Sequence, residues 1–351
     1  MKRKCLAVGI ILLFVGTCII PPTTSKQTLG KTVITVDDEP GDADYISIKD
    51  AVNHSNPGDE IEIYSGTYYE EGIIVNCNNT TIIGIAEELG QGNDTGKPFI
   101  QGNGNDTVLN VAASHVVITN LRIENVLSGL PWTDGLYIGI GTIRDFNNIT
   151  ITNISVRNCT ACGIAHSADG NDIVLTHNDI QKCKTGMAVS SLSKGTLCSN
   201  NTIIDCSNGI QNEGNNDQFS DNIIRRCSVG INFYQGHSSL INRNHIVNCS
   251  VGIYLWNGAE NIITENNFIN YSKNELWWRG YRAIFFSLWS GKKDVWKNNY
   301  WGTWNGKGPQ PIHGTRVITI LFVPFPISIS VKWLAFDWHP AQEPYDIPGM
   351  S

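Results

Sequence analysis

One stretch of the chain, residues 156–270, repeats the same short pattern five times. Each repeat contains a Cys, a Gly followed by an apolar residue, a short strand-like segment, polar turn residues, and finally Asn-x-Ile. The successive cysteines lie 24, 23, 21 and 22 residues apart, and they are Cys159, Cys183, Cys206, Cys227 and Cys249. A period of about 22 residues without an internal helical pattern predicts a solenoid whose turns are short strands.

The repeated residue types decide between two kinds of solenoid. A leucine-rich repeat has a similar period but requires a regular framework of leucines, whereas Ile, Gly, Asn and Cys occupy the repeated places here. We therefore predict an all-β, right-handed parallel β-helix of about ten turns. One turn buries too little apolar surface to be stable alone, but turns stacked about 4.8 Å apart share one core.

Two further repeated positions have predicted structural roles. An asparagine column should link side-chain amides from turn to turn, satisfying polar groups buried at a corner. A glycine column should form a bend too tight for a side chain. The asparagines are Asn178, Asn201, Asn222, Asn244 and Asn267, and the glycines are Gly163, Gly186, Gly209, Gly230 and Gly252.

The composition narrows the class of partner. The 351 residues carry a formal net charge of −7, which argues against nucleic acid as a partner. Helix formers are scarce, whereas Gly, Asn, Ile and Thr are abundant, as is typical of an all-β chain with many turns. We expect a monomer.

The N-terminus, residues 1–25, has the pattern of a signal peptide. A basic segment, residues 1–4, precedes an uncharged apolar run at residues 5–20. An uncleaved N-terminal anchor is the alternative, and in that case this segment alone would contact a membrane. Either reading predicts a secreted or cell-surface protein, in which the eleven Asn-x-Ser/Thr sequons allow glycosylation.

Eight of the ten cysteines follow this leader. Five of them share one repeat position, where parallel neighbours lie side by side rather than converging as a disulfide requires. We predict a buried thiol column there and leave the state of Cys77, Cys162 and Cys198 open. Cys159-x2-Cys162 alone is a weak zinc signal without a second such pair, so we expect no metal site.

The remaining chain divides into three parts. We predict an N-terminal cap at residues 31–72 with an amphipathic segment at Ile46–His54, the β-helix at residues 73–308, and a C-terminal cap at residues 309–351. The apolar segment Val317–Leu334 contains two prolines, which favour a cap strand and hairpin over a membrane span.

The run VDDEPGDADYISIKDAVNHSNPGDEIEIYSGTYYEEGI, residues 36–73, resembles the opening segment of secreted right-handed β-helix proteins of the NosD-like group with PbH1 repeats. NNYWG at residues 298–302 and FDWHPAQEPYDI at residues 336–347 resemble the closing segment of archaeal members. This resemblance implies the fold shared by pectate lyases, polygalacturonases and alginate epimerases, and hence sugar polymers as ligands. The NosD name is attached to copper-site maturation, but the chain lacks the clustered Met, Cys or His that copper needs.

Alternate residues of a strand face opposite sides, so the repeats predict two outward columns. Both change along the chain from small or polar residues to large aromatic residues, which suits sugar rings because they stack on aromatic faces. The alternative is that the aromatics pack under an insertion at Lys273–Arg282. The first column begins with Ala165 and Ala188, and the second begins with Ser167 and Ser190. The predicted carbohydrate-binding residues are Gln211, Glu213, Asn232, Tyr234, Tyr254 and Trp256.

Catalytic signals are sparse. A hydrolase of this fold needs two or three neighbouring carboxylates, and a lyase or epimerase needs a base near a cationic group or calcium ligands. The candidates are Asp134, Asp169, Glu213 and His237. Turn chemistry alone also explains the aspartates.

Three function classes remain open from the sequence. The first is a protein that binds a polysaccharide or glycan, the second a polysaccharide lyase, epimerase or glycoside hydrolase, and the third a structural cell-envelope protein without a small ligand. The sequence requires no cofactor, and calcium would be needed only by a lyase.

Overall fold

The computed structural model describes residues 31–125, 133–139, 146–167, 169–256, 260–271, 278–283, 294–321 and 326–350, with the backbone alone for residues 278–283, 313–321 and 326–333. The predicted signal segment and residues 273–277 of the Lys273–Arg282 insertion lie outside these residues. Within them, no helix has the length and hydrophobicity needed to cross a membrane.

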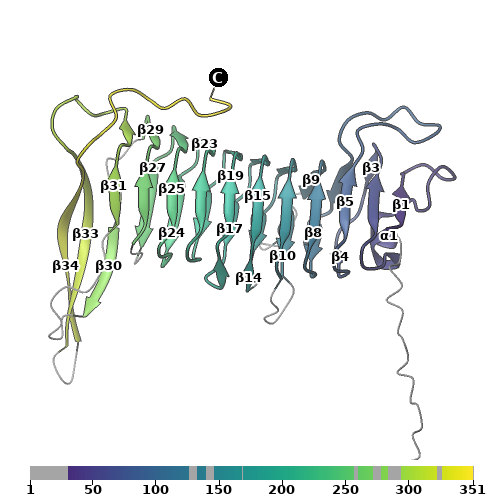
Figure 1. Cartoon of the computed structure of the whole chain (residues 1–351), viewed down its shortest axis with the longest axis horizontal. Helices are drawn as coiled ribbons and strands as arrows, with labels where there is room; N and C mark the ends of the chain where they lie inside the picture. The colour runs from purple at the N-terminus through teal and green to yellow at the C-terminus, as the bar shows by residue number, and fades with distance from the viewer. Residues whose placement is uncertain are drawn as a thin grey trace, which may run out of the picture. The chain divides into compact units, whose positions relative to one another are not determined.

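The chain winds through three parallel sheets in a fixed order, so each turn adds one strand to every sheet (Figure 1). A strand of sheet A is followed by one of sheet B and one of sheet C, and the next turn returns to sheet A. Sheet A contains β1 (Val33–Val36), β2 (Glu60–Ile63), β5 (Thr81–Gly84), β8 (Val116–Thr119), β11 (Ile149–Thr152), β15 (Ile173–Thr176), β19 (Leu197–Ser199), β22 (Gln218–Ser220), β25 (Leu240–Asn242), β28 (Ile262–Thr264) and β31 (Val295–Lys297).

Sheet B contains β3 (Thr67–Tyr68), β6 (Phe99–Gly102), β9 (Arg122–Asn125), β12 (Ser155–Arg157), β16 (Asp179–Gln181), β20 (Thr202–Ile204), β23 (Ile223–Arg225), β26 (His245–Val247), β29 (Asn267–Ile269) and β32 (Tyr300–Trp301). Sheet C contains β4 (Ile73–Val75), β7 (Leu109–Val111), β10 (Leu136–Ile138), β13 (Cys162–His166), β17 (Thr185–Val189), β21 (Asn208–Asn212), β24 (Val229–Tyr234), β27 (Val251–Trp256), β30 (Trp278–Ala283), β33 (Gln310–Leu321) and β34 (Pro326–Asp337). A small extra pair, β14 (Gly170–Asn171) and β18 (Ser193–Lys194), lies between sheets C and A.

The strand pairing confirms the register predicted from the repeats. In sheet B, Ile180 pairs with Ile203, Ile203 with Ile224, and Ile224 with Ile246. All four side chains are buried in the continuous apolar core that the three sheets enclose. The fold is therefore the predicted all-β parallel solenoid, with about 23 residues per turn.

The asparagine column forms the predicted amide ladder at the corner between sheets A and B. The Asn178 side-chain amide donates to Oδ1 of Asn201 (3.0 Å), and Asn201 donates in turn to Asn222 (3.0 Å). Each Oδ1 also accepts the backbone N–H of the preceding asparagine, as Asn201 does from Asn178 (3.0 Å). The ladder thus satisfies side chains that are completely removed from solvent.

The prediction was wrong by one residue at the fifth position. Asn244 donates to Asn266 (2.9 Å) rather than to Asn267, and Asn266 continues to Asn299 (2.9 Å). The reason is that Phe268, not Ile269, fills the inward place of this turn, in register with Ile246. The ladder ends on Asp337 of β34, whose carboxylate accepts the Asn299 amide (3.0 Å).

The glycine column confirms the predicted tight bend, at the corner between sheets B and C. A Cβ atom on Gly230 would lie 2.6 Å from the backbone oxygen of Gly252 and 2.7 Å from Cγ2 of Ile246. Gly186 has the same relation to Gly209 and Ile203. The column is therefore explained by close approach of successive turns.

The repeated cysteines form the predicted buried thiol column, at the same corner as the glycines. All eight cysteines within the described residues are free, including Cys77, Cys162 and Cys198. Hydrogen bonds with the thiols of Cys159 and Cys206, together with burial, raise the pKa of Cys183. These thiols pack as core groups.

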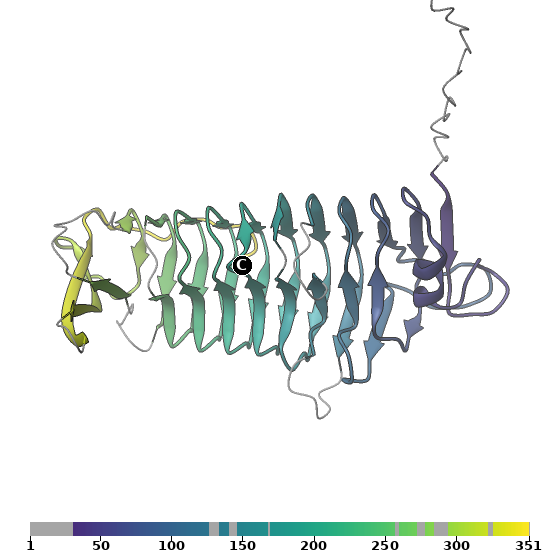
Figure 2. The ribbon, with the colours of Figure 1, turned by 90° about the horizontal axis from the view of Figure 1, so that it is seen from below.

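The predicted amphipathic segment forms the one helix within the described part of the chain, α1 (Ile48–His54). Ser47 caps its N-terminus by accepting the Asp50 N–H (3.1 Å), and Ile48, Ala51 and Val52 are buried. The helix packs against β1, β2 and β4 at the first turns, where Figure 2 shows it. It covers apolar surface that the first turn would otherwise expose.

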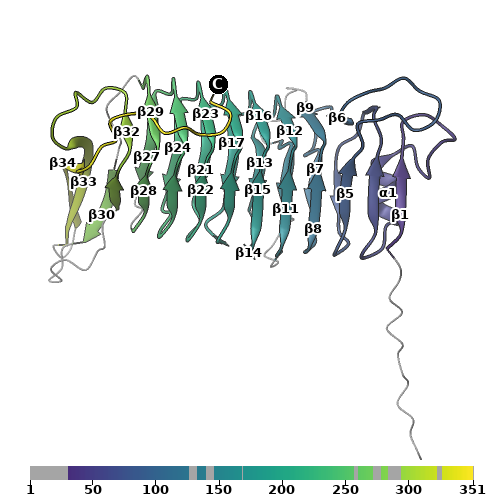
Figure 3. The same cartoon turned by 45° about the horizontal axis from the view of Figure 1, so that its top comes forward.

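The C-terminal segment forms the predicted hairpin and then turns back. β33 and β34 pair antiparallel at the end of sheet C. The C-terminal tail, residues 338–350, then runs back along the outer side of sheet B (Figure 3). It is held by bonds of the Asn267 amide to the Tyr345 backbone (2.7 Å), of Arg243 to Asp346 (3.0 Å) and of Arg225 to Met350 (2.9 Å).

Candidate functional site

The outer face of sheet C carries the two columns predicted from the repeats. The register aligns Ala165 with Ala188, Ala188 with Gln211, Gln211 with Asn232, and Asn232 with Tyr254. It also extends this first column backwards by one turn to Tyr137, which the sequence interpretation missed.

The second column lies two residues further along each strand. Tyr234 pairs directly with Trp256. Glu213 and Ser190 follow the same parallel pattern, because their N–H groups donate to Val189 (2.9 Å) and His166 (2.8 Å) of the preceding turn. Ser167, Ser190, Glu213, Tyr234 and Trp256 therefore lie in one row beside the first column.

The face is hollowed over its two alanines. A groove of about 460 Å³ lies there, because Ala165 and Ala188 are small while Tyr137 on one side and Gln211 on the other are large. Strands β10, β13, β17 and β21 supply its floor and walls. The polar side chains that line it are Asp134, Tyr137, Cys162, His166, Ser167, Lys184, Thr185, Ser190, Asn208, Gln211 and Glu213.

Several groove residues are oriented by one another. The Tyr137 hydroxyl is hydrogen-bonded to Ser167, and the Gln211 side chain donates to Glu213 (3.0 Å). Asp134 accepts the backbone N–H of Cys162 (2.7 Å). Burial raises the pKa of Asp134, and this hydrogen bond opposes the rise. The groove thus presents fixed hydroxyl, amide and carboxylate groups, which are the partners that sugar hydroxyls need.

The aromatic part of the face lies beyond the groove towards the C-terminal turns. The rings of Tyr234 and Trp256 have centroids 5.5 Å apart, and those of Tyr254 and Trp256 are 6.3 Å apart. Tyr234 is 39% exposed. The three rings form one aromatic cluster continuous with the two columns, on β24 and β27.

The catalytic candidates do not converge. Asp134 and Glu213 line the groove. Asp169 lies in the turn after β13, and its backbone oxygen accepts the Phe146 N–H (2.9 Å). His237 is exposed at the corner between sheets C and A, where its N–H donates to Asn215 (3.0 Å). Neither lines the groove.

Sequence reasoning named Asp134 as a catalytic candidate but missed Tyr137 in the same wall of the groove. Both residues belong to a turn that precedes the regular repeats, and Gly135 lies 28 residues before Gly163, further than one period. A usable signal was nevertheless present, because Gly135-Leu136 repeats the Gly–apolar pair of the later turns. Gly135 also has the same close approach to the Gly163 backbone as its counterparts.

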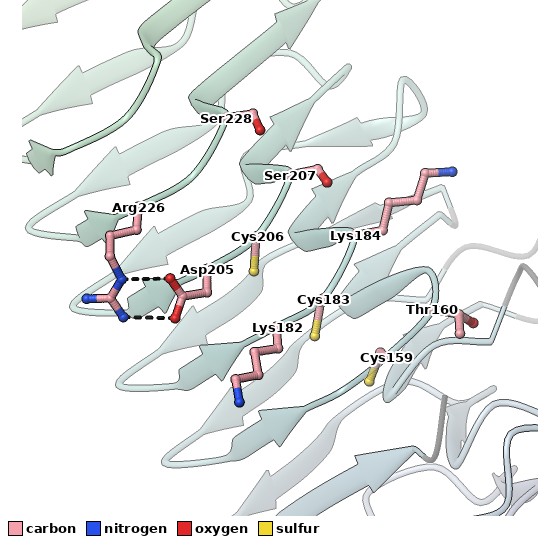
Figure 4. A pocket seen from close by; sticks show the side chains of 10 residues that line it. All are labelled: Cys159, Thr160, Lys182, Cys183, Lys184, Asp205, Cys206, Ser207, Arg226 and Ser228. Carbon is pink, nitrogen blue, oxygen red and sulfur yellow. Dashed lines mark hydrogen bonds and ion pairs between the residues drawn. The ribbon is translucent and has the colours of Figure 1, made fainter. Parts of the chain in front are cut away.

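A second, more open hollow lies over the thiol column, at the corner between sheets B and C (Figure 4). Lys182 and the ion pair of Arg226 with Asp205 (2.7 and 2.8 Å) flank one side of the cysteine row in this view. The hydrogen bond with Arg226 lowers the pKa of Asp205. The thiols beneath are buried, so this hollow offers a ligand mainly exposed charged side chains.

Residues 100–269 match the family described as the right handed beta helix region. The chain is a right-handed parallel β-helix protein. No functionally curated protein matches the sequence of this β-helix protein. Among solved structures it is similar to the GH136 lacto-N-biosidase from Eubacterium ramulus, with 14% identity and a TM-score of 0.55 over 72% of this chain and 60% of that one.

Two further structures are more distant from the β-helix protein. The A-module of the mannuronan C-5 epimerase AlgE4 from Azotobacter vinelandii has 14% identity and a TM-score of 0.43, covering 66% of this chain and 75% of that chain. The DFA-IIIase from Arthrobacter chlorophenolicus A6 has 11% identity and a TM-score of 0.46, covering 82% and 85%. The β-helix protein spans less than two thirds of the lacto-N-biosidase, and at these identities the likeness concerns the fold.

Proposed function

We propose that this β-helix protein binds an oligosaccharide or polysaccharide along the outer face of sheet C. The observation that carries the proposal is that the groove and the aromatic cluster lie in the same two columns. From Tyr137 to Tyr254 the first column crosses five turn-to-turn steps, or about 24 Å at the spacing of parallel strands. Such a length fits several linked sugar units better than one small molecule.

The two halves of the face offer complementary interactions. The groove supplies hydrogen-bonding groups, including the Gln211 amide and the Glu213 carboxylate. The aromatic cluster supplies flat apolar surfaces on which the C–H faces of sugar rings pack. The lacto-N-biosidase shares the fold and by its name acts on a glycan. Glycans are therefore the first ligand class to test.

The test combines a glycan array with matched tryptophan variants. Trp256→Ala should weaken binding of the best glycan by about 1–2 kcal/mol, roughly 5- to 30-fold in Kd, and lower the melting temperature only slightly. Trp338→Ala is the control, because Trp338 is 65% exposed and belongs to the C-terminal tail instead of sheet C. If Trp256→Ala instead lowers the free energy of unfolding by about 3 kcal/mol or more, the side chain has a packing role and the aromatic cluster is not the binding platform.

The second candidate is a polysaccharide lyase, epimerase or glycoside hydrolase acting in the same groove. The specific observation in its favour is that Asp134 and Glu213 both line the groove. Assays for new reducing ends, unsaturated products and epimerised units on array-positive polysaccharides separate binding from turnover. Activity that Glu213→Gln abolishes while binding persists would establish an enzyme. Absence of both binding and turnover would favour a structural protein of the cell envelope.

The proposed place of action is outside the cytoplasm, as a secreted or cell-surface protein. It is supported by the basic and apolar pattern of residues 1–20. Fractionation of the producing cells, with N-terminal sequencing of the protein, tests both the location and cleavage of this segment.

A further inference from the structure

A cluster of carboxylates lies at the N-terminal end of the solenoid, remote in sequence from the groove residues. The turn after β1 contributes Asp37, Asp38 and Glu39, and the segment between β5 and β6 contributes Glu88 and Asp94. Oxygen atoms of Asp37, Asp38 and Glu39 lie within 4.8 Å of one another, and so do those of Glu39, Glu88 and Asp94. Glu39 therefore links the two groups into one cluster.

Asp37 is the member that requires explanation. Its side chain is 0% exposed, and neither of its carboxylate oxygens makes a regular hydrogen bond. Burial of a carboxylate without a partner costs several kcal/mol, so natural proteins pair such groups or let them coordinate a cation. None of the ion pairs among the described residues involves any carboxylate of the cluster.

Two other carboxylates are held so that one oxygen is fixed and the other is left over. Asp38 accepts the Thr67 N–H through Oδ2 (3.0 Å), whereas its Oδ1 is buried without a partner. Glu88 accepts the Asp94 N–H through Oε2 (2.9 Å), whereas its Oε1 is buried without a partner. Backbone N–H groups thus orient both side chains and leave one unused acceptor on each.

The backbone beneath the cluster leaves room for this arrangement. A Cβ atom on Gly66 would lie 1.9 Å from Oδ1 of Asp38, so a side chain at this position would displace the Asp38 carboxylate. The two loops therefore bring five carboxylates into one cluster around the buried Asp37 side chain.

We propose that the carboxylates of Asp37, Asp38, Glu39, Glu88 and Asp94 bind a calcium ion. All five donors are oxygen atoms, which are the ligands of hard cations and not of zinc or copper. Calcium accepts six to eight oxygens in flexible geometry, as two loops can provide, whereas magnesium demands a near-ideal octahedron. This site departs from the expectation of no metal drawn from the sequence, and it is independent of the proposed glycan groove.

The ion would join the turn after β1 to the segment between β5 and β6. These segments already touch, since the Gln91 N–H donates to Asp42 (3.0 Å). Together they lie beside α1 at the N-terminal end of the solenoid (Figure 2). Calcium would thus stabilise the N-terminal end of the solenoid by neutralising its acidic loops.

The test compares melting temperatures of the whole protein in EDTA and in millimolar calcium chloride. Wild-type protein should melt several degrees higher in calcium than in EDTA, and a titration should give one site per chain. Asp37→Asn should melt at or above wild type in EDTA, because it removes an unpaired buried charge, but should lose the calcium response. Glu88→Gln tests the second loop and should weaken calcium binding at least tenfold.

Asp172→Asn is the matched control, because Asp172 is exposed in a left-handed turn position that asparagine also accepts. It should keep the full calcium response. Terbium luminescence excited through tyrosine gives a second readout, since Tyr68 lies near the cluster: burial, and then the charges of Asp38 and Asp37, raise the pKa of its hydroxyl. No calcium uptake by wild type, or unchanged uptake by both Asp37→Asn and Glu88→Gln, would overturn the proposal, and an equal response to magnesium would overturn the choice of calcium.

Discussion

Replacement of Asn201 by Asp is the most direct test of the amide ladder. The Asn201 side chain donates to the Leu175 oxygen (2.9 Å) and to Oδ1 of Asn222 (3.0 Å), and it is 0% exposed. Aspartate has the same shape but no amide, so both donated bonds are lost. Its second carboxylate oxygen would then face two acceptor oxygens at hydrogen-bonding distance.

The loss can be estimated from these contacts. Two hydrogen bonds account for about 2 kcal/mol, and the buried charge adds a penalty of several kcal/mol that the two N–H groups of Asn178 partly offset. We expect Asn201→Asp to destabilise the protein by about 4 kcal/mol at pH 7, or roughly 10 °C in melting temperature. Burial should raise the folded-state pKa of the new carboxyl above its unfolded value of about 3.9. The defect is therefore largest above the folded pKa and shrinks as pH falls through it, because the protonated acid donates one bond again.

The assay is thermal unfolding at pH 7 and pH 4, with Asn216→Asp as the control. Asn216 lies in an exposed turn with φ of 58°, so Asn216→Asp makes the same chemical change without burying a charge. It should change the free energy of unfolding by less than about 0.5 kcal/mol. Equal melting temperatures for the two variants at pH 7, or a defect of Asn201→Asp that does not shrink at pH 4, would refute the ladder as the source of stability.

Two further predictions concern the glycine bend and a buried histidine. Gly230→Ala should destabilise by more than about 3 kcal/mol in urea unfolding, because its Cβ meets backbone and Ile246, whereas Gly195→Ala, at φ +76° in open space, should cost only about 1 kcal/mol. Similar losses for the two would contradict the close-approach explanation. His166 is buried without a partner, and burial lowers its pKa to about 4 from 6.5. The free energy of unfolding is therefore highest above pH 6.5, where His166 is neutral in both the folded and the unfolded state. It should fall by roughly 3 kcal/mol as pH drops from 6.5 to 4, because the unfolded state takes up the proton first. His166→Val should remove this part of the pH dependence in urea titrations. If the free energy of unfolding keeps the same slope against pH in this variant, His166 is not its source.

The architecture could be predicted because it depends on contacts between equivalent residues of successive turns. Ile180, Ile203 and Ile224 stack because the period repeats, so one sequence period specifies many contacts at once. The ladder shifted at Asn266 because the interpretation used isoleucine as the marker, and Phe268 fills the same inward space. Burial, and not residue identity, sets the register.

Features made of unlike residues could not be read from the repeats. At the corner between sheets C and A, Asp217 accepts the Thr196 N–H (2.8 Å), Ser239 accepts from Asp217 (3.2 Å), and Asn261 accepts from Ser239 (3.0 Å). This second polar column performs the task of the asparagine ladder with three different side chains. The groove was hidden for a related reason, since its depth comes from the contrast between Ala165 and its neighbour Tyr137 across an irregular turn.

The C-terminal tail determines where anything attached to the end of this chain would emerge. Because Arg225 binds Met350 across 125 residues of sequence, the last residues lie beside β23, midway along the stack and not beyond the hairpin (Figure 2). Ile347 is fully buried at this flank. A fused tag or reporter would therefore leave from the side of sheet B and keep clear of both ends of the solenoid. Immobilisation through the C-terminus would lay the molecule on its flank, with the outer face of sheet C still open to solution.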